Sequence, residues 1–268
     1  MTASQKKAAA LLKIEEKISN INVPNGIKKT AVAEIFTDIL NIFNITVEND
    51  LYIKDNILYG TKQNITIPEG ILEIAQSAFQ QKGVENVILP NTLKVIGISS
   101  FYGCYIKNIS LPNSVEEIQN NAFYLNKLEN LIIPEGVTTI GSGAFSNNEI
   151  RNLILPNSLI SIGNGAFGYN PFETITFGSG ITSIPASCFS EMGSLGVFEI
   201  PSTINSIGSG AFYNTGITQL TFGANPIDIE ASAFRGNAFT EVTLPAGSTY
   251  RNNSFDPSVT VTGGTIIP

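Results

Sequence analysis

The side chains that carry out enzymatic chemistry are scarce in this chain of 268 residues, which contains no histidine and only two cysteines. Without histidine the chain cannot form a Ser-His-Asp or Cys-His centre, or a metal site that uses imidazole. Two cysteines are too few for a four-cysteine zinc site or a disulfide framework. The composition therefore predicts a protein that is not an enzyme and that has no cofactor and no metal.

The remaining candidates for catalysis are acidic residues. Adjacent carboxylates occur at Glu15/Glu16 and at Glu116/Glu117. Neighbouring side chains on a helix or strand point apart, so neither pair converges on a substrate, and we interpret both as solvated surface. The oxygen-rich stretch 48–56 lacks the ligand spacing of a calcium loop and is typical of turns.

A repeat of about 22 residues fills most of the chain, and its clearest marker is a phenylalanine that follows a small residue. A proline stands eleven residues before most of these phenylalanines, and an isoleucine usually follows the proline position by six residues. The phenylalanines are Phe79, Phe101, Phe123, Phe145, Phe167, Phe189, Phe212, Phe234 and Phe255. A single unit cannot bury its apolar face, so the units are expected to stack.

Each unit contains the pattern apolar-x-x-apolar-x-apolar-Pro, which predicts a short strand with one buried face that ends at the proline. The stretch from the proline to the phenylalanine is too short for a normal helix, so it predicts a 3₁₀ turn or an irregular arc. Stacking would place neighbouring phenylalanines about 4.7–5 Å apart. Cys104 and Cys188 then lie four rungs apart, too far for a disulfide.

Segments such as LIIPEGVTTIGSGAFSNNEI (131–150) and LILPNSLISIGNGAFGYNPF (153–172) resemble the BspA-like leucine-rich repeats of bacterial surface proteins. The resemblance covers residues 62–255. It implies a right-handed solenoid with a parallel sheet on one face, and a role in adhesion or partner binding without chemistry of its own. The family often has cysteine three residues after the phenylalanine, and here only Cys104 retains it. Asparagine takes that position at Asn126, Asn148, Asn170 and Asn237, where its amide can satisfy backbone groups of the turn.

The predicted fold class is an α+β repeat protein with three parts. Residues 1–47 are expected to form an α-helical cap that covers the first rung. Residues 48–245 form a leucine-rich-repeat solenoid of about nine repeats, which a small hairpin at 50–60 introduces. Residues 246–268 form a C-terminal cap, in which the segment 258–268 closes the core as a pair of short strands.

The outward positions of the strands are the predicted binding site, on the concave side of the solenoid. Exposed aliphatic side chains there have no core to fill, which is typical of a partner surface. The predicted partner-binding residues of this face are Asn86, Ile88, Asn108, Asn130, Ile132, Asn152 and Ile154. The asparagines can form a ladder of stacked amides, and the alternative that these columns only stabilise the sheet stays open. Tyr102 and Tyr124, one residue after the phenylalanines, are a second candidate patch.

Charge also patterns the strands, because the position at the strand entrance alternates in sign along successive rungs. This column is Glu85, Lys107, Glu129, Arg151 and Glu173. Each charge is therefore expected to lie between opposite charges, with each pair contributing about 0.2–1 kcal/mol.

The net charge of −7 and the acidic pI near 4.7 disfavour nucleic acid and anionic membranes as partners. No apolar run reaches the ~18–20 residues of a membrane span. We expect a non-enzymatic adhesion or protein-interaction module of a bacterial surface or secreted protein, with a protein or glycan of a host or neighbouring cell as its partner. The alternative is a structural or receptor-binding protein of a virion or phage tail.

The location depends on the N-terminus, where Lys13, Glu15, Glu16 and Lys17 interrupt the apolar stretch that a signal peptide needs. If a signal peptide was removed from a precursor, the protein is extracellular or at the cell surface. If export does not use such a signal, a virion or cytoplasmic location follows.

Overall fold

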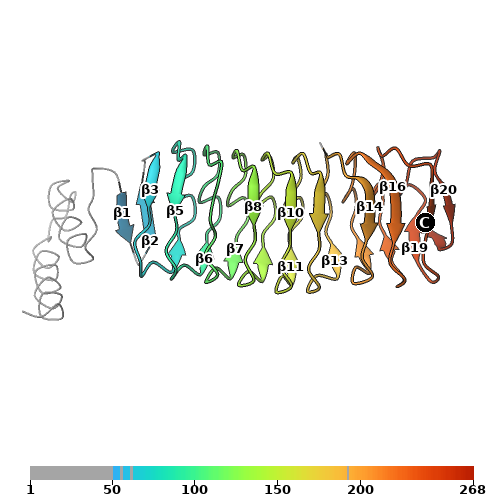
Figure 1. Ribbon diagram of the computed structural model, residues 1–268, viewed down its shortest axis with the longest axis horizontal. Coiled ribbons are helices and arrows are strands. Elements are labelled where there is room, and N and C mark those ends of the chain that lie inside the picture. Colours follow the sequence, from blue (N-terminus) through green and yellow to red (C-terminus); the bar gives the residue numbers. More distant parts are fainter. Residues whose placement is uncertain (1–50, 55–56, 61–62, 192) are drawn as a thin grey trace, which may run out of the picture.

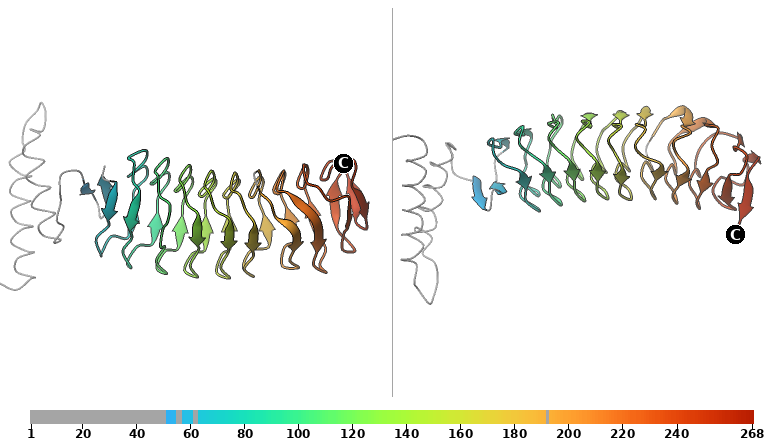
Figure 2. Two further views of the ribbon diagram at one scale, coloured as in Figure 1. Left: turned by 45° about the horizontal axis from the view of Figure 1, so that its top comes forward. Right: turned by 90° about the horizontal axis from the view of Figure 1, so that it is seen from below.

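The computed structural model describes residues 51–54, 57–60, 63–191 and 193–268. These residues wind into a row of similar turns stacked along one long axis (Figure 1), and the row is gently arched (Figure 2). The regular elements of the described part are all β-strands. The helical cap predicted for residues 1–47, and with it the α part of the predicted α+β class, lies outside the described residues.

The strand that was predicted before each proline position is present in all repeats except that of Pro112, and these strands form a first parallel ladder. Its strands are β3 (Asn64–Thr66), β5 (Asn86–Ile88), β8 (Asn130–Ile132), β10 (Asn152–Ile154), β12 (Thr174–Thr176), β14 (Gly196–Ile200), β16 (Ile217–Phe222), β18 (Glu241–Thr243) and β20 (Thr260–Thr262). The ladder is divided into the groups β3–β5, β8–β10–β12, β14–β16 and β18–β20. Asn108 joins it only through a single bridge to Asn130. The first ladder is therefore less continuous than the regular repeat predicted.

A second parallel ladder runs through the isoleucine that usually follows the proline position by six residues, where the sequence predicted a 3₁₀ turn or an irregular arc. Its strands are β4 (Glu73–Ile74), β6 (Val95–Ile96), β7 (Glu117–Ile118), β9 (Thr139–Ile140), β11 (Ser161–Ile162), β13 (Ser183–Ile184), β15 (Ser206–Ile207), β17 (Asp228–Ile229), β19 (Thr249–Arg251) and β21 (Thr265–Ile267). The predicted single sheet is thus one of two. Two residues suffice for a strand here because the neighbouring rung supplies the hydrogen-bond partners.

The segment around each phenylalanine is the true turn of the repeat. Its N–H groups bond alternately within the turn and to the next rung, as in Ala78 N to Ala75 O (3.2 Å) and Phe79 N to Ser100 O (2.7 Å). The residues two before and two after the phenylalanine have positive φ in the first eight rungs. Those after it are Gln81, Gly103, Leu125, Asn147, Tyr169, Glu191, Asn214 and Gly236. The sequence analysis did not identify these left-handed positions.

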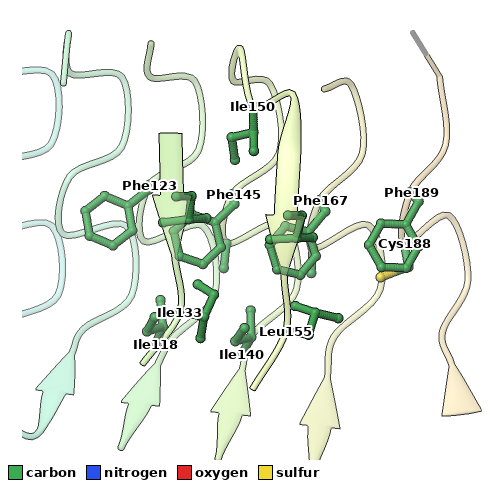
Figure 3. Close-up of a cluster of buried hydrophobic side chains, with 14 of the residues drawn as sticks. Ile118, Phe123, Ile133, Ile140, Phe145, Ile150, Leu155, Phe167, Cys188 and Phe189 are labelled. Atoms are coloured by element: carbon green, nitrogen blue, oxygen red, sulfur yellow. The ribbon is translucent and has the colours of Figure 1, made fainter. Parts of the chain in front are cut away.

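The predicted phenylalanine stack is confirmed and forms the centre of the core, although its rings are farther apart than the predicted spacing, which was that of neighbouring strands. Neighbouring rings are nearly parallel, with centroids 5.2–5.7 Å apart from Phe79 to Phe255. Figure 3 shows the rings of Phe123, Phe145 and Phe167 in a row, with isoleucine and leucine side chains from both ladders around them. Each rung buries its apolar residues against the next, which is why a single repeat has no stable fold alone.

The asparagines three residues after the phenylalanine satisfy backbone groups, as predicted. The Nδ2 of Asn170 donates to the carbonyl oxygens of Phe145 and Phe167, both at 2.9 Å, and its Oδ1 accepts from Ile150 N at 3.1 Å. Cys104 takes part in the same way, since its Sγ donates to Phe79 O at 3.1 Å. A column of buried polar side chains thus fastens each turn to its neighbour.

The two ends of the described solenoid are both built from strands. The predicted hairpin is confirmed as β1 (Leu51–Lys54) paired antiparallel with β2 (Ile57–Gly60), and β2 pairs with β4. At the other end the two predicted short strands are present, and each extends a different ladder. β20 pairs in parallel with β18, and β21 pairs in parallel with β19. The boundaries of the three predicted parts remain a proposal.

Both cysteines are buried and free, as the stacking register predicted. Cys104 belongs to the rung of Phe101 and Cys188 to the rung of Phe189. Burial raises the pKa of both thiols. The two side chains are therefore packed in their protonated form and are poor nucleophiles.

We expect Ser100→Ala to raise the free energy of unfolding by about 1 kcal/mol, because the hydroxyl of Ser100 is buried without a hydrogen-bond partner among the described residues. Alanine fills the same position before the phenylalanine in six other rungs. Ser254→Ala is the matched control, since Ser254 Oγ donates to Ile229 O and accepts from Arg251 N. Urea denaturation measures both effects. If both substitutions lowered the free energy of unfolding equally, the Ser100 hydroxyl would not be an unsatisfied group.

Candidate functional site

The outward surface of the first ladder, here called the strand face, holds the predicted isoleucines. Ile88, Ile132 and Ile154 have 65%, 75% and 59% of their surface exposed. They lie in one column because strand side chains alternate and the intervening residues, such as Leu131 and Leu153, are buried. Ile132 and Ile154 are direct neighbours in register, whereas Ser110 lies in the rung between Ile88 and Ile132.

The predicted asparagine column, Asn86, Asn108, Asn130 and Asn152, runs beside the isoleucines on the same exposed face. Its amide ladder is only partly formed. Asn86 Nδ2 donates to Asn64 Oδ1 at 2.6 Å, and the Thr174 hydroxyl donates to Asn152 Oδ1 at 2.7 Å. Between these ends, within the described residues, no side-chain hydrogen bond links Asn108 or Asn130 to its neighbours in the column. Those amides are available to a partner.

The alternating charges at the strand entrance form fewer ion pairs than the sequence predicted. Within this column Arg151 and Glu173 pair at 2.8 Å, the one ion pair that the described residues form there. Lys127 and Glu149, which belong to another column, pair at 3.0 Å. These pairs are about half exposed, so each contributes little to stability.

Tyr102 and Tyr124, the second predicted patch, stack on each other with ring centroids 5.1 Å apart and an angle of 16° between the planes. Both side chains are half-buried. Their ring faces are therefore largely used against each other and against the turn, which leaves less of them for a partner than the isoleucines offer.

A third surface was not predicted from the sequence. Tyr105, Leu125 and Tyr169 are exposed by 59%, 50% and 48%, and all three line one groove beside the turns. For Leu125 and Tyr169 the signal in the sequence is a large apolar or aromatic residue at the second position after the phenylalanine, where the other repeats up to that of Phe234 have glycine, asparagine, glutamine or glutamate. The positive φ that makes this substitution unusual is visible only in the structure.

The acidic pair Glu116/Glu117 is structural. Glu116 forms an ion pair with Lys94, and Glu117 accepts a hydrogen bond from Gln119 Nε2 at 3.1 Å. The described residues contain no group of three or more metal-binding side chains. Glu15/Glu16 and most of the stretch 48–56 lie outside the described residues.

Parallel strands stacked at a period of 22 residues around a phenylalanine spine, with an ordered outer surface, define a leucine-rich repeat protein. The sequence matches the BspA type leucine rich repeat region in six copies, at residues 13–129, 52–171 and 116–241. The chain therefore belongs to the BspA-type leucine-rich repeat family.

The chain is similar to several solved structures, of which the first supports this fold. A leucine-rich repeat protein from Bacteroides ovatus is 18% identical, with a TM-score of 0.61 over 81% of this chain and 67% of that one. A leucine-rich repeat protein of T. pallidum is 21% identical, with a TM-score of 0.48 over 69% and 85% of the two chains. The pneumococcal vaccine antigen PcpA is 16% identical, with a TM-score of 0.47 over 76% and 65%. No curated protein sequence matches the chain.

Within the part of the chain that the structure describes, no helix is long and apolar enough to cross a membrane.

Proposed function

We propose that this protein is a non-enzymatic binding module whose strand face contacts a macromolecule on a cell surface, either a protein or a glycan. The observation that carries the proposal is the exposed column of Ile88, Ile132 and Ile154 beside amides that lack partners in the column. Apolar contact area surrounded by hydrogen-bonding groups is the usual composition of a protein interface. Membership in the BspA-type family favours an adhesive role at the surface of a bacterium.

The strand face is a better candidate than the second ladder because its exposed apolar side chains share one column. In or directly before the strands of the second ladder, the comparably exposed aliphatic residues are Leu72, Ile160 and Ile266, and no two of them lie in neighbouring rungs. Isolated exposed apolar residues are common on any protein surface, whereas a cluster indicates a contact site. The predicted location at the cell surface and the virion alternative both require such a contact surface.

We expect the triple substitution Ile88→Lys, Ile132→Lys and Ile154→Lys to weaken binding to target cells at least tenfold. Three ammonium groups would have to be desolvated in an interface that is built for aliphatic side chains. The measurement is flow cytometry of the labelled full chain on epithelial and bacterial cells, with circular dichroism to verify folding. Protease or glycosidase treatment of the cells distinguishes a protein from a glycan partner.

The matched control is Leu72→Lys, Ile98→Lys and Ile160→Lys, which introduces the same charge at aliphatic residues exposed by 50%, 37% and 72% outside the strand face. This variant should bind like the parent protein. If the strand-face variant binds normally while Tyr102→Ala with Tyr124→Ala abolishes binding, the contact surface lies at the tyrosines and the proposal is refuted.

A further inference from the structure

A groove of about 940 Å³ runs along the turns beside the strand face, from Gln81 to Tyr169. A hollow of about 550 Å³ continues it to Asn86 and Asn108 at the edge of that face. Tyr105, Lys127 and Glu149 line both, so we treat the two as one surface, the flank groove. Its size is in the range of known small-ligand sites.

The flank groove contains basic side chains without an acidic partner, whereas the basic side chains elsewhere in the described solenoid form ion pairs. Seven basic residues have side chains that the structure describes, and five of them form ion pairs with acidic side chains. The remaining two, Lys82 and Lys107, have no ion-pair partner among the described residues, and both line the groove. Of the two acidic residues in the lining, Glu149 is already paired with Lys127. An excess of positive charge in a chain of net charge −7 favours an anionic ligand.

The groove also holds two large side chains at a backbone position that has positive φ in each of the first eight rungs. Leu125 and Tyr169 have φ of 57° and 58°, in the left-handed region that is unfavourable for an L-residue. Gly103 and Gly236 occupy the equivalent position in other rungs without that cost. Because both large side chains are about half exposed, core packing does not explain them. Strain of this kind is typical of functional positions.

The backbone that lines the groove has no free edge. Gly103 N donates to Tyr124 O at 2.8 Å, Tyr105 N to Val84 O at 2.8 Å, and Lys127 N to Ile106 O at 3.0 Å. A peptide therefore cannot add here as an extra strand, which is the usual way that sheets bind peptides. Recognition must come from side chains: tyrosine rings, the amide of Gln81 and the ammonium groups.

We propose that the flank groove binds an acidic saccharide. The apolar face of a sugar ring stacks on the exposed rings of Tyr105 and Tyr169, and sugar hydroxyls bond to the amide of Gln81. The carboxylate or sulfate groups pair with Lys82 and Lys107. Tyr105 and Tyr169 are three rungs apart, and each rung adds 5.2–5.5 Å at the phenylalanine spine, so the ligand is a chain of several sugar units. This site is separate from the isoleucines of the strand face and does not depend on their role.

The test is calorimetric titration of the full chain with three hexasaccharides: hyaluronan, which carries carboxylates; heparin, which also carries sulfates; and neutral maltohexaose. We expect at least one acidic hexasaccharide to bind, to weaken as salt is raised, and to exceed maltohexaose at least tenfold. Lys82→Gln with Lys107→Gln should weaken that binding at least tenfold. Lys94→Gln is the matched control and should leave binding unchanged, because Lys94 is paired with Glu116 away from the groove.

Tyr169→Gly provides a second variant that keeps the fold, because glycine adopts the positive φ without strain. We expect it to remain folded and to bind at least fivefold more weakly. The triple substitution Ile88→Lys, Ile132→Lys and Ile154→Lys should leave saccharide binding unchanged. Failure of the strand-face proposal can therefore be distinguished from failure of the flank-groove proposal. Failure of both acidic hexasaccharides to bind, or binding that is indifferent to the lysine substitutions, overturns the proposal. Equal binding of a poly-glutamate peptide overturns it in favour of an acidic peptide.

Discussion

Phe145→Ala is expected to lower the free energy of unfolding by about 3–5 kcal/mol, the usual cost of truncating a fully buried phenylalanine. Phe145 is completely buried, and its ring stacks on Phe123 at 5.3 Å and on Phe167 at 5.5 Å. Truncation leaves a cavity in the middle of the stack. The rungs on either side cannot move together to fill it, because that movement would disrupt the hydrogen bonds of both ladders. Guanidinium denaturation followed by circular dichroism measures the loss.

Phe255→Ala is the matched comparison, because it removes the same atoms at the last rung. Phe255 stacks on a single ring, that of Phe234 at 5.6 Å, and is otherwise covered edge-on by Phe239 and Tyr250. Fewer neighbours lose contacts and the terminal rung can relax, so the loss should be smaller. Equal losses at both positions would be inconsistent with a stack in which each rung is held by its two neighbours.

Asn170→Ala should destabilise the protein by about 2–5 kcal/mol through unsatisfied backbone groups rather than through lost volume. The side chain is fully buried, and it is the hydrogen-bond donor to Phe167 O and the acceptor for Ile150 N. Alanine would leave both groups buried without a partner. Differential scanning calorimetry should report a correspondingly lower melting temperature.

An exposed asparagine with several hydrogen bonds provides the control for this effect. Asn157 accepts from Ser179 N and from the Ser179 hydroxyl at 3.0 and 3.1 Å, but water can replace it at the surface. Asn157→Ala should therefore cost less than about 1 kcal/mol. Asn170→Cys should be intermediate, since Cys104 shows that a thiol can donate in this position. A loss at Asn157 as large as that at Asn170 would show that burial does not determine the cost.

The strand face could be predicted from the sequence, whereas the flank groove could not. Ile88, Ile132 and Ile154 could be assigned to an outward column because strand side chains alternate with a period of two, and the buried partners are fixed by the core. The flank groove could not be assigned in this way. Its members recur with the 22-residue period on the turns, as in Gln81, Gly103, Leu125, Asn147 and Tyr169, but a turn has no two-residue alternation that tells which of its side chains point outward.

The sequence by itself determined the repeat, the phenylalanine stack, the strand before every proline position except Pro112 and the absence of a bond between the two cysteines. All of these follow from spacing, because identical units that bury the same face must stack in register. It also determined the role of the asparagine after each phenylalanine, since a buried amide in a turn has only backbone groups to satisfy.

Only the tertiary structure decided the rest. The second ladder through Ile74 and its equivalents consists of two-residue strands, whose partners lie 22 residues away and whose local sequence does not resemble a strand. The breaks in the first ladder and the partial amide column depend on how neighbouring rungs meet. The same is true of Lys82 and Lys107, which form no ion pair with a described residue. A parallel solenoid makes its hydrogen bonds and ion pairs between rungs, so the pattern of one repeat specifies the stack but not what each surface position contacts.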